Sequence, residues 1–218
     1  MVLRLLARFW KGSEQGRVTT GPELANFLSR RAAFAAQKAV IGYCEVKAGV
    51  DRDKLFAYPD FQRELEICRW ESFAAVLADS VVLAEGLLRP HAGGPGGAAA
   101  LGARLAALYG EVLAAERRPP HRPDGWDDLA GPFALRLAEA QAAPPRGPAE
   151  IAAHACRRVT ETLPIQPEHK RADRESIHGG VKFQFLALHD ALLRALDPAA
   201  VAADLLAGAP VPEPALAR

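Results

Sequence analysis

The sequence predicts an all-α protein, an irregular multi-helix bundle built on a long antiparallel helical hairpin. Long stretches are filled with Ala, Leu, Gln and Arg, which favour helices, and short stretches rich in Pro and Gly separate them. No stretch alternates β-branched and polar residues as a strand does. With 218 residues, half of them apolar, the chain can fill one domain, which we expect to span residues 22–207.

Residues 1–11 are predicted to form a short amphipathic helix, with its apolar side chains within one arc of roughly 160° and its basic side chains opposite. The residues expected to bind a membrane or a partner are Arg4, Leu5, Leu6, Arg8, Phe9, Trp10 and Lys11. Three interpretations remain open. The helix packs on the protein's own core, lies on an anionic membrane surface, or fills a groove of a partner protein.

A polar linker over residues 12–21 leads into the predicted hairpin, residues 22–89. We expect Thr20 to cap the first long helix, Pro22–Lys47, because Pro favours the first helical position. After a connection over Gly49–Pro59, we expect Asp60 to cap the second long helix, which runs to about Leu88.

A Gly-rich stretch over residues 90–97 is expected to act as a hinge before the remaining helices, residues 98–207. Pro and Gly residues exclude regular structure in residues 117–125. The helices expected after this loop span residues 126–142, 149–162, 177–196 and 198–207. The tail, residues 208–218, is expected to be disordered.

The second helix of the hairpin is apolar around most of its circumference, which is typical of a helix at the centre of a bundle. Its few charged residues, Glu64, Glu71 and Asp79, therefore need partners. An antiparallel register predicts an ion pair between Arg31 and Glu71. The same register predicts a second pair between Lys38 and Glu64. We interpret the two pairs as a charged seam that fixes the register; the alternative is a buried functional site built on Glu64 and Glu71.

The charge balance excludes a general nucleic-acid binder. The chain has 27 Lys and Arg against 26 Asp and Glu, a net charge of +1, whereas such binders carry a large basic excess. Cys44, Cys68 and Cys156 have no paired spacing, which excludes a disulfide scaffold and a Cys-based zinc module. We expect these residues to be small buried hydrophobic groups in a reducing compartment.

No membrane-spanning helix and no secretion signal are expected. The longest apolar candidate, Phe73–Leu88, is interrupted by Asp79 and Glu85. The N-terminus lacks a continuous apolar region followed by a small-residue cleavage site. We therefore expect a cytoplasmic protein, which lies at the inner face of the membrane if the N-terminal helix binds lipid.

The sequence contains no recognisable catalytic motif. No Ser lies in a G-x-S-x-G elbow, and Gly93–Gly97 lacks the Lys-Ser/Thr of a phosphate-binding loop. We therefore assign no catalytic residue and expect no cofactor. An unorthodox hydrolase site would combine Ser72 and Glu71 with the C-terminal histidines. Of these, His189 falls on the apolar arc of its helix and is expected to be a buried, neutral histidine.

A metal site is a further alternative. Glu175 and His178 have the Glu-x-x-His spacing of di-iron helical bundles, and Glu150 and His154 stand one helical turn apart. A complete di-iron site needs a second Glu-x-x-His motif, which the sequence lacks. We therefore assign no metal ligand.

Two segments of the hairpin resemble a known group of proteins. Arg30–Lys38 with the following Gly42–Tyr43, and the later Trp70–Asp79, are similar to the front half of a group of small bacterial proteins. Members of this group have no assigned function, and some are labelled esterases. The resemblance covers residues 20–90 and carries over no catalytic residue. It implies an esterase-like hydrolase as the alternative function.

We expect a non-enzymatic helical interaction or assembly protein. The tethered amphipathic helix at the N-terminus and the missing catalytic motifs favour this function. Its partner would be another protein, a second copy in a homodimer, or an anionic membrane surface, and no nucleic acid. The alternatives are a hydrolase with an unrecognised site and a helical metal-binding protein.

Overall fold

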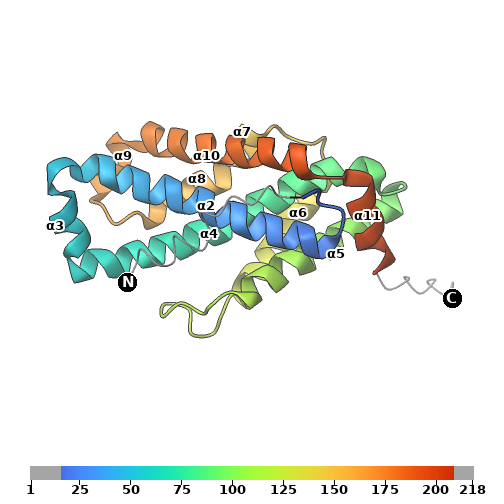
Figure 1. Ribbon diagram of the computed structural model, residues 1–218, viewed down its shortest axis with the longest axis horizontal. Helices are drawn as coiled ribbons and strands as arrows, with labels where there is room; N and C mark the ends of the chain where they lie inside the picture. The colour runs from blue at the N-terminus through green and yellow to red at the C-terminus, as the bar shows by residue number, and fades with distance from the viewer. Residues whose placement is uncertain (1–15, 209–218) are drawn as a thin grey trace.

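The computed structural model describes residues 16–208, and these are folded into helices packed side by side (Figure 1). This confirms the all-α class. Within residues 16–208, β-type pairing is limited to one isolated bridge between Val18 and Leu196. The predicted N-terminal helix, residues 1–11, and all but the first residue of the tail, residues 208–218, lie outside the described range. The α-helices are α2 (Gly21–Ala48), α3 (Arg52–Ala57), α4 (Pro59–Leu88), α5 (Pro95–Ala115), α6 (Ala130–Gln141), α7 (Pro148–Ile151), α8 (Ala153–Thr162), α9 (Pro167–Ala172), α10 (Arg174–Ala195) and α11 (Pro198–Ala207). Short 3-10 turns are η1 (Gly49–Asp51), η2 (Arg89–His91) and η3 (Asp127–Leu129).

The two longest helices, α2 and α4, form the predicted antiparallel hairpin (Figure 1). The N-terminus of α2 is capped as expected, because the Thr20 hydroxyl accepts a hydrogen bond from the Glu23 N–H and the Glu23 carboxylate accepts one from the Thr20 N–H. The prediction that Asp60 caps α4 is wrong. The helix begins at Pro59, whose fixed φ suits the first helical position, and Asp60 accepts a hydrogen bond from Arg63 instead (2.9 Å).

The register of the hairpin differs from the prediction by about one helical turn. Arg69 of α4 donates a hydrogen bond to the Gln37 side chain of α2 (2.9 Å). The predicted ion pair between Arg31 and Glu71 is not formed, because Glu71 is bonded to cations of other segments. The prediction took the partners of Glu64 and Glu71 from α2, whereas α4 is surrounded by helices.

The second predicted ion pair, between Lys38 and Glu64, is also not formed. Glu64 is exposed, and its carboxylate lies 4.0 Å from the neighbouring Arg63. Water solvates this carboxylate, so it needs no partner from α2. The two pairs therefore do not make a charged seam between the long helices.

The central position predicted for the second long helix is confirmed. α4 contacts α2, α5, α8 and most of the other helices, and every residue from 71 to 85 is buried. One hydrophobic cluster includes buried side chains from helices on both sides of the 90–97 stretch. The hairpin and the later helices therefore share a core.

The stretch of residues 90–97 is a tight turn. Gly93 and Gly94 have φ values of 74° and 106°, a region that glycine enters without strain. Helix α5 begins at Pro95, before the expected residue 98. A Cβ atom on Gly97 would lie 1.6 Å from a backbone oxygen, so this first turn of α5 also requires glycine.

Within the described range, α5 is the helix that is long and apolar enough to cross a membrane, judged by length and composition alone. This property of α5 was not predicted from the sequence. In the structure α5 contacts α2, α4, α6 and α11, and 39% of its most apolar stretch is buried.

The segments after α5 form helices near their predicted positions, and residues 117–125 form a loop as predicted. Helix α9 was not predicted, because its alternating charges are typical of a solvated segment. Helix α10 continues through Gly179–Gly180. Its end is fastened to the segment before α2, because the Val18 N–H donates to the Ala195 carbonyl and the Asp197 N–H donates to the Val18 carbonyl (2.8 and 2.9 Å).

Candidate functional site

Three buried carboxylates follow one another along α4. Glu71, Asp79 and Glu85 are at most 5% exposed, although a buried carboxylate without partners costs several kcal/mol. The prediction that Glu71 and Asp79 need partners is confirmed, because an arginine from another segment contacts each of them. These contacts fasten the C-terminal half of the chain to α4.

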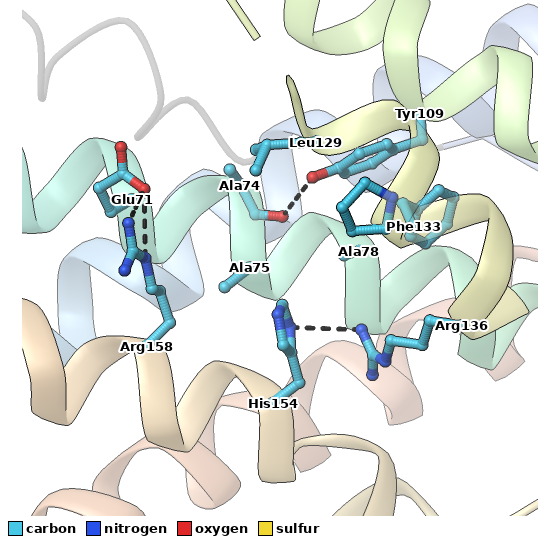
Figure 2. Close-up of a pocket in the computed structure, with 11 residues that line it drawn as sticks. Glu71, Ala74, Ala75, Ala78, Tyr109, Leu129, Phe133, Arg136, His154 and Arg158 are labelled. Carbon is cyan, nitrogen blue, oxygen red and sulfur yellow. Dashed lines mark hydrogen bonds and ion pairs between the residues drawn. The ribbon is translucent and has the colours of Figure 1, made fainter. Parts of the chain in front are cut away.

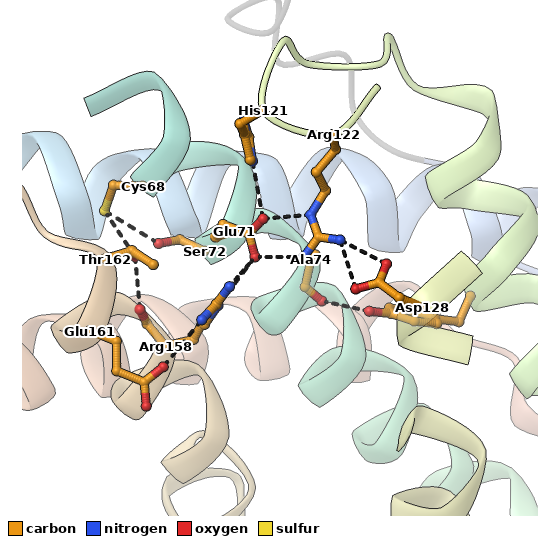
Figure 3. A network of polar contacts seen from close by, with 11 residues as sticks. Cys68, Glu71, Ser72, Ala74, His121, Arg122, Asp128, Arg158, Glu161 and Thr162 are labelled. Atoms are coloured by element: carbon orange, nitrogen blue, oxygen red, sulfur yellow. Dashed lines mark hydrogen bonds and ion pairs between the residues drawn. The ribbon is translucent and has the colours of Figure 1, made fainter. Parts of the chain in front are cut away.

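Glu71 lies at the centre of the largest network (Figure 3). Its Oε1 accepts a hydrogen bond from Arg122 Nε (2.6 Å) and lies 3.0 Å from His121 Nε2. Its Oε2 accepts one from Arg158 Nη2 (2.6 Å). Burial alone would raise the pKa of Glu71, but the hydrogen bonds and positive charges of Arg122 and Arg158 outweigh burial and lower this pKa to about 2. Glu71 is therefore ionised at neutral pH and joins two segments to α4.

The two arginines of this network are also held by carboxylates nearer the surface (Figure 3). Arg122 Nη1 donates to both oxygens of Asp128 (2.7 and 2.9 Å), and its guanidinium lies over the Trp126 ring, 4.6 Å from the centroid. Arg158 Nη1 donates to Glu161 (3.3 Å). Each guanidinium is thus fixed in position by two carboxylates.

Asp79 makes the second contact, two turns further along α4. Its Oδ1 accepts a hydrogen bond from Arg136 Nη2 of α6, and its Oδ2 accepts one from the Ala155 N–H of α8 (3.0 Å for the latter). His154 Nδ1 lies 3.5 Å from Asp79 Oδ1 and 3.3 Å from Arg136 Nη1.

Glu85 makes the third contact, near the end of α4. Arg89 Nε and Nη2 each donate to a different oxygen of Glu85 (2.8 and 2.6 Å). Gln141, the last residue of α6, donates from Nε2 to Glu85 Oε1 (3.1 Å) and to the Ala98 carbonyl of α5 (2.6 Å). This cluster connects α4, α5 and α6 at one end of the molecule.

A cavity of about 230 Å³ lies between the Glu71 and Asp79 networks (Figure 2). It is lined by Glu71, Ala74, Ala75, Ala78, Tyr109, Leu129, Pro132, Phe133, Arg136, His154 and Arg158. The short alanine side chains of α4 leave the space open, and the Tyr109 and Phe133 rings, with centroids 4.1 Å apart, supply an apolar wall. The side chains of His154 and Arg158 are 38% and 37% exposed, so both can be reached from solvent.

The carboxylates in and beside this cavity are engaged, whereas two nitrogen atoms of its basic side chains are not. Both oxygens of Glu71 and both oxygens of Asp79 already accept hydrogen bonds. Among the contacts of the described residues, His154 Nε2 and Arg136 Nε have no hydrogen-bond partner. The cavity therefore suits a ligand that accepts hydrogen bonds at the polar rim and is apolar elsewhere.

The structure does not bring Ser72 together with a histidine. Ser72 is fully buried, and its hydroxyl lies 3.8 Å from the Cys68 sulfur. No histidine of the described part of the chain forms a hydrogen bond with Ser72. Glu71, next to it in the sequence, is held by Arg122 and Arg158.

The pairs considered for a metal site do not form one cluster. In residues 16–208, no group of three His, Cys, Asp or Glu side chains is placed to hold a metal ion. His154 contacts Arg136 and Asp79. The backbone carbonyl of His178 accepts a contact from the Cys156 thiol (3.7 Å).

The prediction of a buried histidine at position 189 is wrong. The His189 side chain is 21% exposed, and its Nδ1 lies 3.2 Å from Asp190 Oδ1. The buried side of α10 is formed by residues such as Phe185, Leu188 and Leu192. His189 lies at the edge of this apolar arc, where its ring can turn to the neighbouring carboxylate.

Arg122, Arg136 and Arg158 were not predicted from the sequence to belong to this site. Each is separated from its carboxylate on α4 by 51 to 87 residues, and no local pattern marks the pairing. The available signal was the presence of charges on an otherwise apolar helix, which shows that partners exist without showing where they are.

The fold and this site define an all-α protein with a small, polar-rimmed cavity beside its central helix. Comparisons of the chain with protein-family models, with curated proteins and with solved structures gave no match.

Proposed function

We propose that this protein binds a small organic molecule with a carboxylate or a similar acceptor group, in the cavity between α4, α6 and α8. The observation that carries the proposal is the division of the lining into an apolar part and a rim of basic side chains, Arg136, His154 and Arg158. Apolar cavities of about 150 Å³ are known to hold a benzene molecule. A volume of about 230 Å³ therefore suits one aromatic ring or a short alkyl chain with its acid group.

The charges around the cavity are nearly balanced. Arg136 is matched by Asp79, and Arg158 is matched by Glu71 and Glu161. Directed hydrogen bonds, rather than a strong positive field, would therefore hold the acid group. For a ligand of this size we therefore expect a dissociation constant of about 10 µM to 1 mM. This constant should change little with ionic strength, because the site has no strong net charge.

Calorimetric titration of the full-length protein tests this proposal. The probes are benzoate and hexanoate, with benzyl alcohol and hexanol as counterparts that lack the acid. Ala75→Leu fills the cavity, and Ala107→Leu makes the same change at an exposed position of α5 as a matched control. We expect the acids to bind to the unmodified protein and to Ala107→Leu, and not to Ala75→Leu.

Two results would overturn the proposal. One is the absence of heat with either acid when circular dichroism shows a folded protein. The other is equal binding by Ala75→Leu and the unmodified protein.

A non-enzymatic docking role through residues 1–11 remains a proposal from the sequence, because these residues lie outside the described range. It is compatible with ligand binding in the cavity. A hydrolase built on Ser72 has less support, since this side chain is buried and does not line the cavity.

A further inference from the structure

A second cavity, of about 450 Å³, lies between α2, α5 and α11. These three helices contact one another, and the cavity begins at the first turns of α2 (Figure 1). Leu108 and Val112 of α5 belong to its apolar lining, and polar side chains of all three helices line the rest. The cavity shares no lining residue with the cavity beside α4.

Arg104 is the one basic side chain among the described residues that line this cavity. Within residues 16–208 its guanidinium takes part in no hydrogen bond or ion pair, and its Nε is buried. Asp204, in the same lining, accepts a hydrogen bond from the Gly21 N–H instead (2.7 Å). A buried donor that lacks an acceptor costs free energy, and a guanidinium can bind a carboxylate with two parallel hydrogen bonds. Arg104 therefore has the capacity to bind a carboxylate that a ligand supplies.

Two carboxylates of the lining, Glu111 and Glu116, have no cationic partner in the part of the chain that the structure describes. Glu116 Oε1 accepts a hydrogen bond from the Ser29 hydroxyl (3.2 Å). Glu111 follows Arg104 by seven residues, which is about 10 Å along the axis of α5 and returns to the same side of the helix. Leu108 lies between them on that side. The lining thus carries a positive charge at one end, negative charge at the other and an apolar side chain between.

We propose that this cavity binds a linear zwitterion, a molecule with a carboxylate at one end, an ammonium group at the other and an alkyl chain between them. Arg104 would hold the carboxylate, and Glu111 and Glu116 would hold the ammonium group. The alkyl chain would lie on Leu108. A plain acid or a plain amine would leave one charged end of the cavity without a counter-charge. The proposal goes beyond the function proposed above and does not depend on it, because the two cavities have different linings.

Calorimetric titration of the full-length protein with 6-aminohexanoate tests this proposal. Hexylamine lacks the carboxylate and hexanoate lacks the ammonium group. Hexanoate is titrated into Ala75→Leu, in which the cavity beside α4 is filled. The test variants are Arg104→Gln and Glu111→Gln, and the control is Glu139→Gln, at an exposed position of α6. Because Glu111 is also exposed, Glu111→Gln should leave the fold intact.

We expect 6-aminohexanoate to bind equally well to the unmodified protein, to Ala75→Leu and to Glu139→Gln. Loss of one hydrogen bond between charged groups should weaken its binding about tenfold or more in each test variant. Hexylamine and hexanoate should bind more weakly by a similar factor, since each lacks one charged group.

Three results would overturn the proposal. One is the absence of heat with 6-aminohexanoate when circular dichroism shows a folded protein, and another is full binding by Glu111→Gln. The third is loss of binding in folded Ala75→Leu, which would assign the zwitterion to the cavity beside α4. None of the first two results bears on benzoate binding beside α4, which is measured with a different probe and a different variant.

Discussion

Arg158 Nη2 lies 2.6 Å from Glu71 Oε2, although the two residues are 87 positions apart in the sequence. The contact joins α8 to the central helix and forms one end of the cavity. Arg122 joins the loop of residues 117–125 to the same carboxylate. Glu71 therefore holds one end of the cavity in place, and Asp79 holds the other end through Arg136 and the Ala155 N–H.

Replacing Glu71 should destabilise the protein strongly. In Glu71→Gln the charge is removed, while Arg122 and Arg158 remain partly buried, so we expect a loss of about 3 kcal/mol in the free energy of unfolding. Urea denaturation at neutral pH measures this loss. Glu64→Gln on the same helix is the matched control, because Glu64 is exposed, and it should change the free energy by less than about 0.5 kcal/mol. Similar losses in both variants would show that burial of Glu71 is not the cause.

The contribution of Glu71 to the free energy of unfolding should depend on pH in a defined window. Its pKa is about 2 in the folded protein and has an ordinary value of 4.5. A lowered pKa means that the contribution is fully present above pH 4.5 and is lost as the pH falls towards 2. The difference in unfolding free energy between the unmodified protein and Glu71→Gln should therefore shrink across this window. A difference that stays constant down to pH 2 would contradict the assignment.

Two glycine substitutions in helix interiors should have opposite effects. In Gly102→Ala the new Cβ would lie 2.5 Å from Gln141 Oε1, and the displaced side chain would lose its contact with Glu85, so we expect a loss of about 1–3 kcal/mol. Gly42→Ala meets nothing within 4 Å and should stabilise α2 by about 0.5–1 kcal/mol. Thermal denaturation of both variants measures the sign. Stabilisation by both would show that Gln141 moves away without cost.

The three cysteines should react slowly with thiol reagents while the protein is folded. The prediction that they are buried is confirmed for Cys44, Cys68 and Cys156. Burial raises the pKa of all three thiols, to about 12 for Cys44 and about 11 for Cys156, so few thiolates exist at pH 8. A colorimetric disulfide reagent should label them at the rate of unfolding, and rapidly in urea. Fast labelling of the native protein would contradict their burial.

The sequence predicted several features of the fold that depend on local chemistry. The Thr20 cap, the helix beginning at Pro198 and the loop at residues 117–125 follow from residues next to each other in the chain. The site depends on contacts between distant segments. The predicted register paired α4 with α2. In the structure, Glu71 and Asp79 are bonded to segments that pack on other sides of α4.

Methyl NMR of the full-length protein with labelled alanines tests ligand binding in the cavity most directly. Titration with benzoate should shift the methyl signals of Ala74, Ala75 and Ala78 along a single saturation curve, and leave Ala107 unchanged. Benzyl alcohol should produce smaller shifts, because it lacks the carboxylate that the rim donors would hold. Saturable shifts of the three cavity methyls are the result that the structure predicts. An unchanged spectrum, or shifts confined to exposed alanines, would contradict binding at this site.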